Sequence, residues 1–121
     1  MSSILIVDDD PQVAATLSVL LKKLKYAVTT TGSGREALSL AQSTPFDIVI
    51  LDVRMPEMDG FAVLRALRAQ GYTAGVIMLT GQGDVEEAVE ASQLGADDYL
   101  PKPVRMAALE RVLANLATRR P

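Results

Sequence analysis

A single stretch decides the fold, Ile4-Leu5-Ile6-Val7-Asp8-Asp9-Asp10-Pro11, in which four apolar residues lead through three acids to a proline suited to a first helical turn. Similar apolar runs alternate with segments of helical periodicity along the rest of the chain. This alternation is typical of a parallel sheet with crossover helices. We therefore expect one α/β domain over residues 1–121, a (βα)5 arrangement.

Five apolar runs of strand length are expected to form the sheet. They are Ile4–Val7, Ala27–Thr30, Ile48–Leu51, Val76–Leu79 and Tyr99–Leu100. The first, third and fourth are apolar throughout, as strands covered on both faces must be. The second holds Thr29 and Thr30, and the fifth is short and follows two acids, so both belong at the edges. With right-handed crossovers, these constraints give a doubly wound sheet of flavodoxin-like order 2-1-3-4-5.

The helices carry start signals and apolar stripes. Asp10 is expected to cap the first, and Ser33 with Glu36 has the capping-box spacing for the second. Asp84 and Glu87 repeat that spacing before the fourth helix. The residues expected to face the core from the fourth helix are mostly small, so this helix should be weakly held. They are Val85, Ala88, Val89 and Ala91. The last helix carries one apolar face, made of Met106, Leu109, Val112, Leu113 and Leu116.

The composition excludes several classes of function. The chain has no cysteine and no histidine, which removes disulfides, zinc fingers, His-ligated metals and Ser-His triads. Its net charge of −3 offers no general attraction to nucleic acid or to anionic lipid. No leader is evident and no apolar run approaches the roughly 20 residues that span a bilayer. We expect a soluble cytoplasmic protein that binds neither DNA nor membranes.

Acidic residues follow the first and third strands, where ligands bind in sheets of this order. Asp8, Asp9 and Asp10 come after one strand and Asp52 after the other. Carboxylates crowded at one place repel each other or hold a cation, and an all-oxygen site with room for water suits Mg²⁺. Asp8 and Asp9 can share one ion only if the strand has already turned into a loop. The alternative is that these acids only cap the first helix.

The fourth and fifth strands are followed by Thr80 and Lys102. A carboxylate, a cation, a hydroxyl and an ammonium are the groups needed to transfer a phosphoryl group to an aspartate. Taken singly, Thr80 could be a turn residue and Lys102 a solvated surface charge. Their joint placement with the acids favours phosphoryl chemistry.

Four motifs in order resemble the receiver domain of bacterial two-component response regulators. They are Ile4 to Pro11, Asp52-Val53-Arg54-Met55-Pro56-Glu57-Met58-Asp59-Gly60, Leu79-Thr80-Gly81 and Tyr99-Leu100-Pro101-Lys102-Pro103. The resemblance implies that Asp52 is the phosphoacceptor and that its donor is a histidine kinase or a histidine phosphotransfer protein. It also implies that Asp8, Asp9, Asp52 and the backbone carbonyl of Arg54 bind Mg²⁺. The chain would then be a signalling domain and not an enzyme acting on a separate substrate.

By the same resemblance, Thr80 and Lys102 contact the phosphoryl group, and the Lys102–Pro103 peptide is cis. Thr80 and Tyr99 would act as coupled switch residues. We expect phosphorylation to reshape the surface of the fourth helix, the fifth strand and the fifth helix, which would control an output domain or partner and could carry a homodimer contact. The alternative for Tyr99 is an edge-strand aromatic that covers the core.

Three rivals are less consistent with the sequence. A haloacid-dehalogenase-type phosphatase would use Asp8, Asp10, Thr80 and the acidic pair at 97–98, but its lysine precedes the later acids, whereas Lys102 follows them. A flavin-binding module would place phosphate where three aspartates repel it. A receiver-like module that is never phosphorylated would be expected to lack one of the acids, and none is missing.

Overall fold

The computed structural model describes residues 2–81 and 85–119. The sheet is parallel, with strand order β2-β1-β3-β4-β5, as predicted. Its strands are β1 (Ser3–Val7), β2 (Ala27–Thr31), β3 (Ile48–Asp52), β4 (Gly75–Thr80) and β5 (Asp98–Pro101). Each predicted strand lies within these bounds, so the apolar runs in the sequence correctly predict all five strands.

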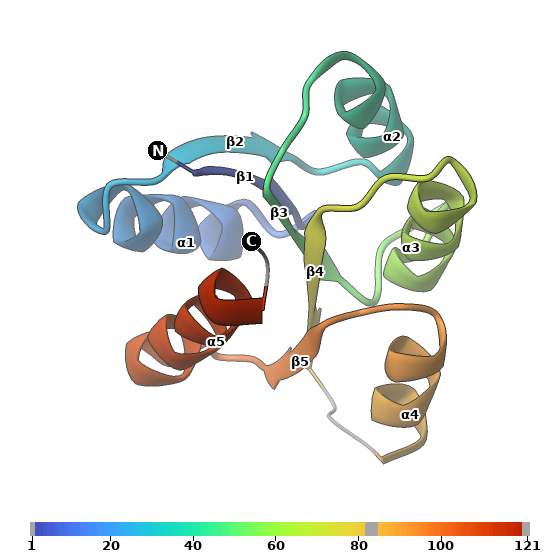
Figure 1. Ribbon diagram of the computed structural model, residues 1–121. Helices are drawn as coiled ribbons and strands as arrows, with labels where there is room; N and C mark the ends of the chain where they lie inside the picture. The colour runs from blue at the N-terminus through green and yellow to red at the C-terminus, as the bar shows by residue number, and fades with distance from the viewer. Residues whose placement is uncertain (1, 82–84, 120–121) are drawn as a thin grey trace.

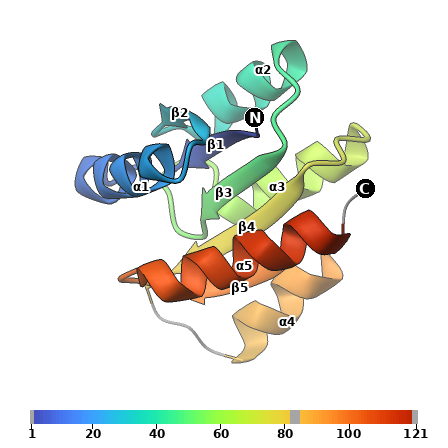
Figure 2. The same ribbon diagram turned by 60° about the vertical axis from the view of Figure 1, so that its left-hand side comes forward.

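Helices alternate with the strands and cover both faces of the sheet. They are α1 (Pro11–Lys23), α2 (Gly34–Ser43), α3 (Gly60–Ala69), α4 (Val85–Gln93) and α5 (Met106–Arg119). Helices α1 and α5 lie on one face, and α2, α3 and α4 lie on the other (Figure 1). The turned view shows α5 lying along the sheet beside β4 and β5 (Figure 2). No helix among the described residues is long and apolar enough to cross a membrane.

The central strands supply two cores because neighbouring side chains point to opposite faces. Leu5 and Val7 pack with the α2–α3 side, whereas Ile4 and Ile6 pack with the α1–α5 side. All four side chains are buried. Thr29 and Thr30 of the edge strand β2 are exposed, as expected for an edge.

The predicted helix starts are partly confirmed. The Asp10 carboxylate accepts hydrogen bonds from the first turn of α1, and Ser33 accepts one from the backbone of Glu36. The Glu36 side chain accepts from the Thr31 hydroxyl, in place of the reciprocal bond of a capping box. Asp84, the cap predicted for the fourth helix, lies outside the described residues.

The inward face predicted for α4 is partly wrong. Val85 and Val89 are 79% and 49% exposed, whereas Glu87 and Ala91 are the buried residues of this helix. The face that points to the sheet holds Ala91 and Glu87, whose carboxylate contacts Thr80, Tyr99 and Arg54, and the two valines are left in solvent. The expectation that α4 buries little apolar surface holds, and Ala91 is buried as predicted.

Candidate functional site

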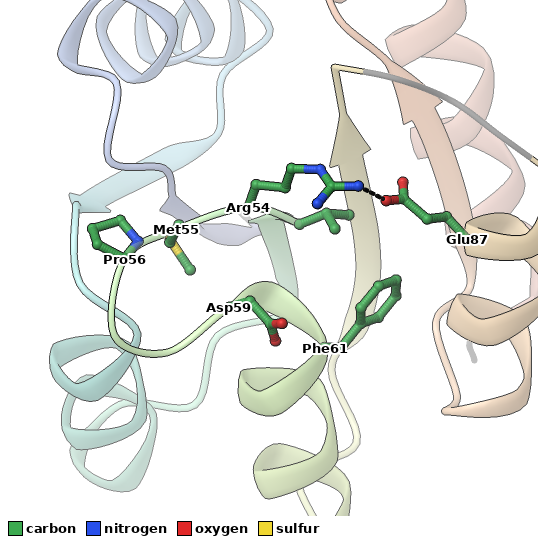
Figure 3. A pocket seen from close by; sticks show the side chains of 7 residues that line it. Arg54, Met55, Pro56, Asp59, Phe61 and Glu87 are labelled. Atoms are coloured by element: carbon green, nitrogen blue, oxygen red, sulfur yellow. Dashed lines mark hydrogen bonds and ion pairs between the residues drawn. The ribbon is translucent and has the colours of Figure 1, made fainter.

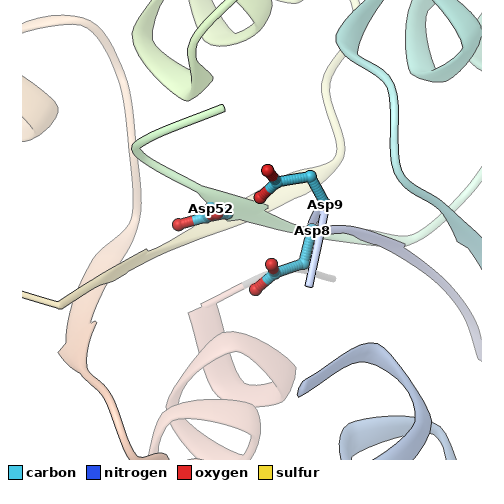
Figure 4. Close-up of side chains that lie close together, drawn as sticks. All are labelled: Asp8, Asp9 and Asp52. Atoms are coloured by element: carbon cyan, nitrogen blue, oxygen red, sulfur yellow. The ribbon is translucent and has the colours of Figure 1, made fainter. Parts of the chain in front are cut away.

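Three carboxylates meet where β1 and β3 end. Asp8 and Asp9 follow the last residue of β1, where the strand has turned into a loop, and Asp52 is the last residue of β3. One oxygen from each carboxylate lies within 4.8 Å of the others. Figure 4 shows the three side chains gathered at these strand ends. The topology therefore brings together acids that are 43 residues apart or more, as the strand order predicted.

Lys102 reaches into the same cluster from the loop after β5. Its Nζ lies 2.9 Å from Asp8 Oδ2 and 3.1 Å from Asp52 Oδ1. The peptide between Lys102 and Pro103 is cis, as the resemblance implied. Since Asp8 and Asp52 are both buried, this ammonium offsets part of the negative charge at the site.

The environment changes the acidity of Asp52. Burial of its carboxyl, followed by the negative charge of Asp8, raises the pKa of Asp52 from 3.8 to about 6, although Lys102 and the backbone of Arg54 counteract this. Burial lowers the pKa of Lys102, but its contacts with Asp8 and Asp52 outweigh burial and raise it. At neutral pH Asp52 is therefore mainly a carboxylate facing an ammonium, which suits a nucleophile.

Asp8 is held by the backbone through one oxygen and by the Lys102 ammonium through the other. Its Oδ1 accepts a hydrogen bond of 2.9 Å from the backbone of Asp10. Its Oδ2 is buried and, among the described residues, accepts no hydrogen bond, although it forms the ion pair with Lys102. A buried carboxylate oxygen whose partner is a cation is placed to serve as a ligand for a metal ion as well.

The loop after β3 passes very close to Asp52. A Cβ added at Gly60 would lie 2.2 Å from the backbone oxygen of Asp52, and the Gly60 amide donates to the backbone oxygen of Val53. The backbone amide of Arg54 lies 3.4 Å from Asp52 Oδ1. Asp59 caps α3 immediately afterwards. Glycine at position 60 thus lets helix α3 begin close to the backbone of Asp52.

Thr80 ends β4 one residue beyond Leu79, which pairs with Asp52 in the sheet. Its side chain is buried, and its hydroxyl donates a hydrogen bond of 2.9 Å to Glu87 Oε1. The Tyr99 hydroxyl donates to the same Oε1 at 2.7 Å. The two predicted switch residues therefore meet at a third residue, and not directly at the acidic cluster.

The sequence predicts only a capping-box role for Glu87, with Asp84, which lies outside the described residues, and does not predict that Glu87 points toward the sheet. Its other oxygen, Oε2, lies 2.6 Å from a guanidinium nitrogen of Arg54. Helical spacing could have predicted the inward orientation of Glu87. Ala91 follows Glu87 by four residues, Leu94 follows Ala91 by three, and both alanine and leucine pack on the core. Those three positions share one face, which points Glu87 inward.

One protein family matches most of this chain. Residues 4–114 match the family described as the response regulator receiver domain. The transcriptional regulatory protein ZraR of Escherichia coli K12 is 43% identical over 93% of this chain and 26% of its own length. The response regulator MprA of Mycolicibacterium vanbaalenii is 45% identical over 93% of this chain and 48% of its own length. The chain therefore spans between about a quarter and a half of these relatives.

Solved structures give the same result over nearly whole chains. The chemotaxis protein CheY4 of Vibrio cholerae superposes with a TM-score of 0.90 at 36% identity, covering 96% of this chain and 98% of that one. A response regulator receiver domain from Clostridium thermocellum reaches a TM-score of 0.92 at 32% identity, covering 99% and 97%. With the sheet order and the acidic cluster at its switch point, these matches establish that the chain belongs to the response regulator receiver domain family of two-component signal transduction.

Proposed function

We propose that Asp52 accepts a phosphoryl group from a histidine kinase or a histidine phosphotransfer protein. An Asp52 oxygen forms the new P–O bond while the P–N bond of the donor phosphohistidine breaks, and the imidazole leaves and takes up a proton from solvent. The observation that carries this proposal is the position of Asp52, a buried carboxylate that shares the Lys102 ammonium with the neighbouring Asp8 carboxylate. The chain acts as a signalling domain whose own residues promote this transfer.

Lys102 and Thr80 are the groups proposed to bind the phosphoryl oxygens. The Lys102 Nζ already lies 3.1 Å from Asp52 Oδ1, so it can neutralise charge on a phosphoryl group attached there. Thr80 follows the residue that pairs with Asp52 and carries a hydroxyl that can donate to a phosphoryl oxygen after it leaves Glu87. Both residues would act by orienting the group and balancing its charge.

The acidic cluster fits Mg²⁺. Asp8, Asp9 and Asp52 supply carboxylate oxygens that lie close together, and the buried Asp8 Oδ2 already pairs with one cation, the Lys102 ammonium. Mg²⁺ prefers oxygen ligands and keeps several waters, which suits a site that is exposed at Asp9. We propose these three residues and the backbone carbonyl of Arg54 as its ligands. When bound, the ion would balance negative charge on the phosphoryl oxygens.

The output surface is proposed to be formed by α4, β5 and α5. Thr80 at the site and Tyr99 on β5 are linked through Glu87 of α4, so a change at Thr80 can reach this surface. Val85 and Val89 are exposed on α4, which suits contact with an output domain, a downstream protein or a second copy of the chain. Residues 1–121 are proposed to act as one cytoplasmic receiver domain without nucleic-acid or membrane binding of their own.

Intact mass measurement after incubation with acetyl phosphate and Mg²⁺ tests the phosphoacceptor. The expected result is one phosphoryl adduct on the unaltered chain and none on Asp52→Asn. Asp59→Asn is the matched control, because Asp59 lies in the same loop, is exposed, and an asparagine still caps α3. This control should carry the adduct. An adduct that persists on Asp52→Asn, or turnover of a phosphate-ester substrate in place of an adduct, would refute the proposal.

A further inference from the structure

The carboxylate of Glu87 in α4 joins three other segments, the end of β4, strand β5 and the loop after β3. Its Oε1 accepts from the Thr80 hydroxyl of β4 at 2.9 Å and from the Tyr99 hydroxyl of β5 at 2.7 Å. Its Oε2 accepts from the Arg54 guanidinium, in the loop after β3, at 2.6 Å. Only about 9% of Glu87 is exposed, although it lies on a helix that otherwise buries little. Such a carboxylate is held in place by its partners.

A hydroxyl has one proton and can donate one hydrogen bond at a time. Thr80 gives that proton to Glu87 in this structure, whereas the proposed phosphorylated state needs it for a phosphoryl oxygen. A carboxylate and a phosphoryl group are both negatively charged acceptors, so they compete for the same donor. The Tyr99 hydroxyl shares Oε1 with Thr80, and its environment must change when Thr80 leaves.

Arg54 links the same competition to the acceptor loop. Its backbone amide lies 3.4 Å from Asp52 Oδ1, while its guanidinium points to Glu87 (Figure 3). The ion pair borders a surface cavity of about 450 Å³ whose lining also includes Pro56, Asp59 and Phe61. This cavity provides space beside Glu87 into which its side chain could turn once Thr80 is released.

We propose, on the basis of the phosphoacceptor function above, that Glu87 is a positioning residue of the switch. Its carboxylate holds the Thr80 and Tyr99 hydroxyls and the Arg54 guanidinium in the resting arrangement. It thereby opposes phosphorylation by competing with phosphoryl oxygens for the Thr80 hydroxyl. The phosphorylated state is reached when Thr80 exchanges Glu87 for the phosphoryl group and Glu87 moves away from Tyr99.

Titration with beryllofluoride in the presence of Mg²⁺, a stable analogue of the phosphoryl group, measures this competition. Glu87→Gln replaces the charge-assisted hydrogen bond from Thr80 by a weaker neutral one and is expected to tighten binding about tenfold. Glu87→Ala removes the competing acceptor and should tighten binding at least as much. Glu86→Gln is the matched control, because Glu86 is the neighbouring acid of α4 and is exposed. It should change the dissociation constant less than twofold. Equal or weaker binding in both Glu87 variants would overturn the proposal.

A double-mutant cycle separates competition from simple charge repulsion. In a Thr80→Ala background the hydroxyl is absent, so Glu87→Gln should alter beryllofluoride binding less than twofold. A tenfold change that persists in this background would overturn the proposal, because it would show that the charge of Glu87 acts without Thr80. The cycle gives a coupling between the two substitutions only if Glu87 acts through Thr80. A purely structural role of Glu87 in α4 would give no such coupling.

The unaltered chain provides a measurement that does not depend on folding of a variant. The ¹³C resonance of the Glu87 carboxyl is expected to move when beryllofluoride binds, while that of Glu86 stays in place. A Glu87 resonance that does not move at saturation would overturn the proposal. Absence of any beryllofluoride binding together with absence of an acetyl phosphate adduct would refute the phosphoacceptor function itself. Binding by the unaltered chain with no Glu87 effect would refute this inference alone.

Discussion

Replacing Asp52 by asparagine is expected to stabilise the metal-free protein at neutral pH. The folded-state pKa of about 6 exceeds the ordinary value of 3.8 because the carboxyl is buried next to Asp8. The folded chain therefore binds this proton more tightly than the unfolded chain, and the stabilisation from that proton is present below about pH 3.8 and lost as the pH rises through 6. A pKa difference of about 2, at about 1.4 kcal/mol each, costs the folded state about 3 kcal/mol at pH 7.

Urea unfolding in EDTA measures this cost. At pH 7, Asp52→Asn should raise the free energy of unfolding by about 2 to 3 kcal/mol, because the neutral amide avoids repulsion with Asp8 while a carbonyl oxygen can still face Lys102. At pH 4.5 the gain should fall to about 1 kcal/mol, since the folded-state carboxyl is then protonated. Glu110→Gln, which removes an exposed acid of α5, should stay within about 0.5 kcal/mol at both pH values.

Added Mg²⁺ should reduce the difference between the two proteins. A cation that binds the folded acidic cluster stabilises the unaltered chain by about 2.7 kcal/mol at a concentration 100 times its dissociation constant, and asparagine removes one carboxylate ligand. The reasoning would be refuted if Asp52→Asn were no more stable than the unaltered chain at pH 7 in EDTA. A gain of equal size at pH 4.5 and 7 would also refute it, because burial of a titrating carboxyl could not then be the cause.

Two further substitutions test the packing around the site and at the opposite end of the sheet. Gly60→Ala should lower the free energy of unfolding by about 2 kcal/mol or more in urea, because the new Cβ would meet the backbone oxygen of Asp52 at 2.2 Å. An unchanged denaturation midpoint would show that the loop relaxes freely. Tyr72→Phe should cost about 1 to 2 kcal/mol, since the Tyr72 hydroxyl bridges the carbonyl of Thr44 and the amide of Phe46. A loss below 0.5 kcal/mol would mean that water replaces both bonds.

The acidic cluster could be predicted because its position follows from the topology. The carboxyl ends of parallel strands lie at one edge of the sheet, so any residue just after β1 and β3 must meet there. Predicting that Asp8, Asp9 and Asp52 lie together required only correct strand assignments. The central strands are apolar throughout, which made those assignments reliable. Lys102 was placed by the same argument applied to β5, and its two ion pairs agree with it.

The orientation of α4 could not be predicted from its composition. Valines and alanines occur on more than one face of this helix, so the apolar pattern favours no rotation strongly. The rotation depends on Glu87, whose partners Thr80 and Tyr99 belong to other strands. Local propensity contains no information about donors that are distant in the chain, so the apolar pattern predicts Val85 and Val89 inward although both are exposed.

The sequence alone determined the parallel sheet, its strand order and the acids at its switch point, since these depend on the period of apolar residues and on chain topology. The tertiary structure decided which face α4 turns inward, how closely Gly60 approaches Asp52, and how far burial raises the pKa of that acid. These three properties depend on distances between side chains and backbone of different elements. Such distances are fixed only when the helices pack on the sheet and exclude water from the site.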